Sequence, residues 1–120
     1  MNRLFILALI LSTHPSAVAG ESDVLSVDVS CNDDANCRFD VTVKHGDEGW
    51  EHYANRWEIL SPDGEILATR ILAHPHVNEQ PFTRSLANIR IPANLEEVVI
   101  RAHDLMHGYG GREFVVKLPN

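Results

Sequence analysis

The sequence predicts an all-β domain, an immunoglobulin-like antiparallel sandwich of about seven strands. Apolar and polar side chains alternate along most of the chain, turn-forming residues recur at regular intervals, and no stretch has the spacing of a stable helix. Seven short strands in about a hundred residues are typical of this class of sandwich.

The segment before the first strand has the features of a signal peptide. Arg3 supplies a positive charge, a short apolar run follows, and Ala17-Val18-Ala19 fits the small-residue pattern of a cleavage site. The apolar run is too short to span a bilayer as a helix, and no later stretch is apolar enough to do so. We therefore expect residues 1–19 to be removed on export to a periplasm or to the outside, leaving 20–120 as one β-sandwich domain.

The first two strands are expected at 25–31 and 37–44, where Leu, Val and Phe alternate with polar residues. Asn and Asp between them favour a tight connection, so the two strands should form a hairpin. Cys31 and Cys37 flank that connection. Because an exported protein meets an oxidising compartment, we expect them to form a disulfide.

Five further strands follow along the chain. Ser61-Pro62-Asp63-Gly64 is a strong turn signal that separates the first two of them. Trp57, on the third strand of the domain, is expected in the core. The five expected strands are 53–60, 66–72, 82–91, 97–102 and 114–118.

The charge balance is acidic. The chain has 17 Asp and Glu against 10 Lys and Arg, a formal net charge of −7, and loss of Arg3 would make it −8. Such a surface argues against partners that are nucleic acids or anionic membranes, because Lys and Arg hold both. It suits cationic partners, including metal ions.

Six of the seven histidines lie after the predicted cleavage site, and all six fall in or beside every second connection between the expected strands. Consecutive antiparallel strands reverse direction, so alternate connections meet at one end of the sandwich. The sequence therefore predicts a metal site at that end, made from His45, His52, His74, His76, His103 and His107.

Local spacing supports this prediction. His74 and His76 flank Pro75, which favours an extended backbone, so the two rings should point the same way. His45 and His52 enclose a loop that adds carboxylates, and glycines after His107 allow a sharp turn. Imidazole with carboxylate suits transition metals, and an exported protein meets copper or zinc most readily, with iron a further possibility.

Two of these motifs resemble those of a known family, the superoxide reductases (desulfoferrodoxins), whose iron domain is also an immunoglobulin-like sandwich. His45 and His52-Tyr53, followed by Trp57, are similar to the family's first motif. His103-Asp104-Leu105-Met106-His107-Gly108 looks like its Cys-x-x-His-Gly motif, with His103 in place of the thiolate. The resemblance implies ligand roles for His45, His52 and His107, and for His103 by substitution.

Other interpretations of the same loops stay open. One is a binding module that presents Trp50, Tyr53 and Tyr109 to a protein or glycan partner. Another is a pH-sensitive histidine cluster. An enzyme without a metal is the least favoured, because no serine lies in a nucleophile-elbow motif and no carboxylate pair stands out. Whether the protein catalyses any reaction is left open by the sequence.

Overall fold

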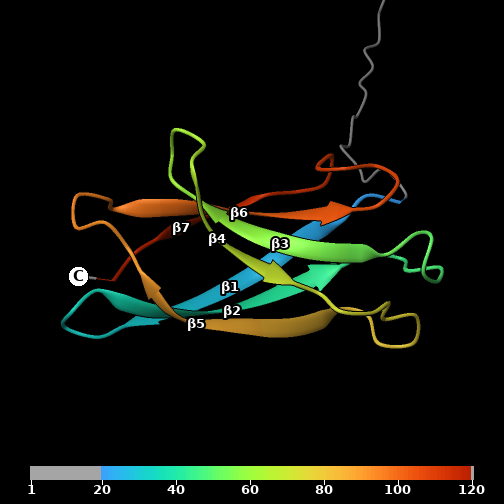
Figure 1. Cartoon of the computed structure of the whole chain (residues 1–120), viewed down its shortest axis with the longest axis horizontal. Coiled ribbons are helices and arrows are strands. Elements are labelled where there is room, and N and C mark those ends of the chain that lie inside the picture. The colour runs from blue at the N-terminus through green and yellow to red at the C-terminus, as the bar shows by residue number, and fades with distance from the viewer. Residues whose placement is uncertain (1–19, 120) are drawn as a thin grey trace, which may run out of the picture.

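The structure is a computed structural model that describes residues 20–119, so the predicted signal peptide lies outside the described residues. Within that range no helix is long and apolar enough to cross a membrane. The described chain folds into seven strands (Figure 1). They are β1 (Asp23–Cys31), β2 (Asn36–Lys44), β3 (Ala54–Leu60), β4 (Ile66–Ile71), β5 (Phe82–Arg90), β6 (Glu97–Asp104) and β7 (Phe114–Lys117).

The strands form two antiparallel sheets, which confirms the predicted all-β sandwich. One sheet has the order β1-β2-β5 and the other β4-β3-β6-β7. All seven predicted strands are present. The main difference is that β6 continues two residues beyond the predicted end, from Ala102 to Asp104, and this extension brings Asp104 into the ladder opposite Ala54.

The core lies between the sheets and is built from the alternating apolar residues. On β2, every second residue from Cys37 to Val43 is buried, and β6 shows the same alternation. Trp57 is fully buried, as predicted. Side chains along a strand alternate between its two faces. The alternation on β2 and β6 therefore decides which residues just beyond the core, near the connections, point into the sandwich.

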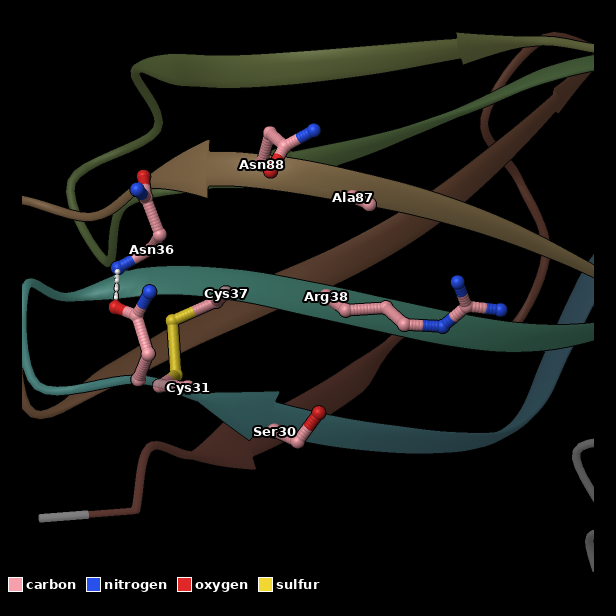
Figure 2. Close-up of a pocket in the computed structure, with 8 residues that line it drawn as sticks. Ser30, Cys31, Asn36, Cys37, Arg38, Ala87 and Asn88 are labelled. Atoms are coloured by element: carbon pink, nitrogen blue, oxygen red, sulfur yellow. Dashed lines mark hydrogen bonds between the residues drawn. A yellow bond between two sulfur atoms is a disulfide. The ribbon is translucent and has the colours of Figure 1, made fainter.

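The predicted disulfide between Cys31 and Cys37 is confirmed. The two residues are direct partners in the β1–β2 ladder, so the bridge closes the hairpin at its turn. Figure 2 shows it beside a pocket that Ser30, Arg38 and Asn88 help to line, with Asn36 N donating to Asn32 Oδ1 at 3.1 Å. This pocket contains no histidine and lies at one end of the sandwich.

The six histidines lie at the opposite end, as predicted. Connections 45–53, 72–81 and 105–113 meet there, together with the segment that leads into β1, on the right in Figure 1. We call this the histidine end.

Candidate metal centre

His45 continues the inward alternation of β2 past the end of the strand. Val41, Val43 and His45 are all buried, and the His45 side chain has no exposed surface. Its Nε2 lies 2.7 Å from Asp104 Oδ2 and 2.9 Å from the carbonyl oxygen of Gly20. The ring is therefore held where the core meets the histidine end, with Nε2 facing the Asp104 carboxylate and the Gly20 carbonyl.

Asp104 occupies the same inward phase on β6, following Ile100 and Ala102, and is fully buried. Its Oδ1 accepts a hydrogen bond from the backbone amide of His107, which fixes the tight turn after β6. Its Oδ2 lies close to three imidazole nitrogens: 2.7 Å from His45 Nε2, 3.2 Å from His52 Nε2 and 3.0 Å from His107 Nδ1. One carboxylate oxygen is thus the common neighbour of three rings.

The other two rings come from separate connections. His52 ends a turn in the 45–53 connection, where its amide donates to the Gly49 carbonyl. Its Nε2 lies 3.2 Å from His107 Nδ1 and 3.3 Å from Gly20 O. His107 is the most open member, with 34% of its side chain exposed. The donor atoms converge from three parts of the chain.

The outer nitrogens of the two buried rings face carboxylates. His45 Nδ1 contacts Asp47 Oδ1, and His52 Nδ1 lies 2.7 Å from Glu48 Oε1. An ionised carboxylate only accepts, so each Nδ1 carries a proton, and in the neutral form of the ring Nε2 presents a lone pair. Both Nε2 atoms face the acceptors Gly20 O and Asp104 Oδ2, and His52 Nε2 also faces Nδ1 of His107.

This arrangement fits a metal ion. Lone pairs that face one another repel unless a proton or a cation stands between them. Zinc binds imidazole nitrogen at about 2.0–2.1 Å, so neighbouring ligand atoms of a tetrahedral zinc site lie about 3.3–3.4 Å apart. The separations in this cluster, 2.7 to 3.3 Å, reach that spacing or are somewhat shorter. Ligand atoms of His45, His52 and Asp104 all lie within 4.8 Å of one another, and metal-binding histidines usually donate their other N–H to a carboxylate, as here.

The electrostatics of the cluster also favour a cation. The hydrogen bond to Glu48 raises the pKa of His52, against the opposing effect of burial. Burial would raise the pKa of Asp104, but the His107 amide and the His107 and His45 rings outweigh it and lower that pKa to about 2. Asp104 is therefore ionised at neutral pH, and with Asp47 and Glu48 it surrounds the rings with negative charge.

His74 and His76 form a separate pair. The rings lie 4.6 Å apart, with His76 buried and stacked on Phe82 and His74 exposed. His76 Nε2 lies 2.9 Å from an Arg84 nitrogen, so a cationic neighbour faces this ring. Burial, with a smaller contribution from Arg84, lowers the pKa of His76.

The His74–His76 pair is linked to the centre through Asp47. The backbone amide of His76 donates to Asp47 Oδ2 at 2.6 Å, while Asp47 Oδ1 contacts the ring of His45. Asp47 also accepts from the Ala54 amide. The 72–81 connection therefore helps to fix the carboxylate that orients His45, but its own imidazoles do not join the convergent donor atoms.

His103 lies on the other face of its sheet. Ala102 and Asp104 point inward, so His103 between them points outward. Its Nδ1 lies 2.6 Å from Asn55 Oδ1, and its ring meets Tyr109 edge-on with centroids 4.7 Å apart. The predicted single six-histidine site is thus divided, and Asp104 rather than His103 accompanies His107.

Three contributors were not singled out from the sequence. Asp104 carried a usable signal, because a carboxylate in the inward phase of a strand has to find partners. Asp47 was included only as one of several loop carboxylates. Gly20 contributes a backbone carbonyl, and nothing in the sequence indicates that role.

The comparisons with known proteins add one relative. No protein-family model matches the chain, and no solved structure matches it, so neither comparison finds a match to superoxide reductase. The chain is 38% identical over 96 residues to a protein of Halomicrobium mukohataei described as a "Putative lipoprotein". The alignment covers 80% of this chain and 47% of the relative, so the chain spans about half the relative's length.

Proposed function

We propose that this protein is an exported metal-binding domain that holds one transition-metal ion at the histidine end. His45, His52, His107 and Asp104 are the proposed ligands. The observation that carries the proposal is that two buried imidazoles, each with Nδ1 turned to a carboxylate, direct Nε2 at the same carboxylate oxygen. Without a cation or a proton between them, these groups would leave lone pairs opposed in a buried site.

Export is the second part of the proposal. A signal peptide cleaved after Ala19 would release 20–120 outside the cytoplasm, where the Cys31–Cys37 disulfide is stable. The lipoprotein description of the relative agrees with a location outside the cytoplasm. The proposal takes from the relative export alone.

Copper or zinc is the proposed ion, with iron as the competing choice. Three imidazoles and a carboxylate suit Zn(II) and Cu(II), whereas two histidines and one carboxylate with open positions suit Fe(II). The superoxide reductase likeness supports the position of the ion at His45, His52 and His107. It does not extend to that activity, because no thiolate reaches this end of the domain and the thiolate tunes that iron.

A protein partner at the histidine end is a second proposal, and exposed apolar side chains favour it. Trp50 and Met106, in two of the connections around the centre, are 65% and 64% exposed, and Val77 in the third is 54% exposed. Carriers of metal ions need a surface for the protein that supplies or receives the ion. Tyr109, by contrast, is engaged with Arg56 and Glu58 and presents less surface.

Metal titration tests the primary proposal. We would titrate residues 20–120 with Zn(II) and with Cu(II) by calorimetry, then repeat with His52→Ala and His107→Ala. His74→Ala and His103→Ala are matched controls, since they remove the same group from the same end. Circular dichroism and denaturant unfolding would establish that each variant is folded.

The proposal expects one ion per chain, bound more tightly than about 1 μM, with affinity reduced at least about a hundred-fold in His52→Ala and His107→Ala and unchanged in the controls. Binding no tighter than about 100 μM, or binding lost only in the control variants, would overturn it.

A further inference from the structure

The backbone of Gly20 lies beside the proposed metal ligands. Its carbonyl oxygen lies 2.9 Å from His45 Nε2 and 3.3 Å from His52 Nε2. No other backbone carbonyl is found within hydrogen-bond distance of either Nε2 in residues 20–119. This carbonyl oxygen can accept a hydrogen bond from a protonated Nε2, and when a metal ion displaces that proton it can serve as a further oxygen ligand.

Gly20 also packs against the third ring. A Cβ atom added to it would lie 2.6 Å from His107 Cε1, 3.1 Å from Nε2 and 3.2 Å from Nδ1, closer than real Cβ contacts. The Gly20 backbone therefore packs closely against the His107 ring, and a side chain at this position would require that ring to move.

The segment that carries Gly20 is held by the 105–113 connection. A Cβ on Gly111 would meet the Ser22 carbonyl oxygen at 1.7 Å, and one on Gly110 would meet the Glu21 carboxylate at 1.9 Å. Arg112 N donates to Asp23 Oδ1 at 2.7 Å, and Ser22 is fully buried. The glycines after His107 thus make room for the incoming chain, and the start of the domain is fixed at the ligand loop.

We propose that the α-amino group of Gly20, freed by cleavage after Ala19, is itself a ligand of the metal ion. This inference rests on the proposed function. The amine and the carbonyl oxygen of one residue can close a five-membered ring on one ion, so Gly20 would chelate through N and O beside His45, His52 and His107. An α-amino group has an ordinary pKa of about 7.7–8.0, far below that of lysine. It can therefore release its proton to the solvent on binding metal near neutral pH.

The same chemistry links metal binding to processing. Before cleavage, the nitrogen of Gly20 is a peptide amide, whose lone pair is delocalised into the carbonyl and whose N–H is retained. The precursor offers only the Gly20 oxygen. The complete ligand set exists only after the signal peptide has been removed, so the domain acquires its full affinity outside the cytoplasm.

Two chains with different starting points test this inference. One begins at Gly20. The other begins at Ser16, which buries the Gly20 nitrogen in a peptide bond, places the new amine four residues away and leaves out His14. Both would be titrated with Cu(II) and Zn(II) near neutral pH, and the Cu(II) forms compared by electron paramagnetic resonance. Denaturant unfolding of the metal-free chains would check that the extension leaves the fold intact.

We expect the chain that begins at Ser16 to bind at least about ten-fold more weakly, since loss of even an outer-shell partner costs about 10–100-fold. Its copper spectrum should show one nitrogen ligand fewer. Equal affinity and identical spectra in the two chains would overturn this inference and leave the proposed function standing. Absence of tight binding in both chains would overturn the two together.

Discussion

Glu48 is the most accessible carboxylate at the proposed metal centre, with 73% of its side chain exposed, and its Oε1 lies 2.7 Å from His52 Nδ1. Glu48→Gln removes the charge but keeps the shape, so the ring loses the partner that makes Nε2 a stronger donor. We expect metal affinity to fall about ten-fold. Calorimetry measures it, with Glu51→Gln, another exposed residue of the same connection, as the matched control. Equal affinity in both variants would contradict the orienting role of Glu48.

Protonation of His52 gives the centre a defined pH dependence. Glu48 raises the pKa of His52, so protons compete with metal at a higher pH than for an ordinary histidine. Affinity should therefore rise as the pH is raised from about 5.5 and level off only above the His52 pKa. In Glu48→Gln the plateau should be reached at lower pH. A pH series of zinc titrations checks this, and a profile unaltered by the substitution would count against it.

Single residues also decide which histidines belong to the centre. Asp104 and His103 are neighbours in the chain, but side chains alternate between the faces of a strand, so the two lie on opposite faces of the sheet. Counting the inward phase from Val98 through Ala102 would have identified Asp104. The contact of Gly20 with the rings has no such signal, because it depends on how the segment before β1 packs against a connection about ninety residues away.

At the scale of elements, Glu58 joins β3 to β6 and to the connection that follows. It is buried and accepts hydrogen bonds from Arg101 Nε at 2.9 Å, Arg56 Nε at 2.9 Å and Tyr109 OH at 2.9 Å. Burial alone would raise its pKa, but these donors lower it below the ordinary value. The ionised form is thus the one that the folded state stabilises.

Glu58→Gln should lower the free energy of unfolding by about 1–3 kcal/mol near neutral pH. Because the folded-state pKa is lowered, the stabilisation is complete above the ordinary pKa of 4.5 and disappears as the pH falls through the folded value. The difference between wild type and variant should therefore shrink at about pH 3. Urea unfolding at both pH values measures it, and a constant difference would contradict the assignment.

The strands themselves could be predicted from the sequence with little ambiguity. Period-two alternation and the Ser61-Pro62-Asp63-Gly64 turn set their number and order, and hence which connections share an end. Alternation does not show how far a strand continues past its last apolar residue. The two added residues of β6 were missed for that reason, and they are the ones that carry Asp104.

Over the whole molecule, the β1–β2 turn, which the disulfide closes, and the histidine end, which holds the proposed metal centre, lie at opposite ends of the sandwich (Figure 1). Replacing Cys31 and Cys37 by alanine opens a short loop, which the chain-entropy account values at about 2 kcal/mol of stability. We expect unfolding in urea to shift accordingly while zinc affinity stays within about two-fold of wild type, since distant sites act independently. A large fall in affinity in the folded variant would show that the two ends are coupled.

The most direct test of the metal centre is an X-ray structure of residues 20–120 loaded with zinc or copper, with anomalous scattering recorded at the absorption edge of the metal. We predict one strong peak about 2.0–2.2 Å from His45 Nε2, His52 Nε2, His107 Nδ1 and an Asp104 oxygen. A peak at His74 and His76 or beside His103, or no ordered peak in loaded crystals, would contradict the account.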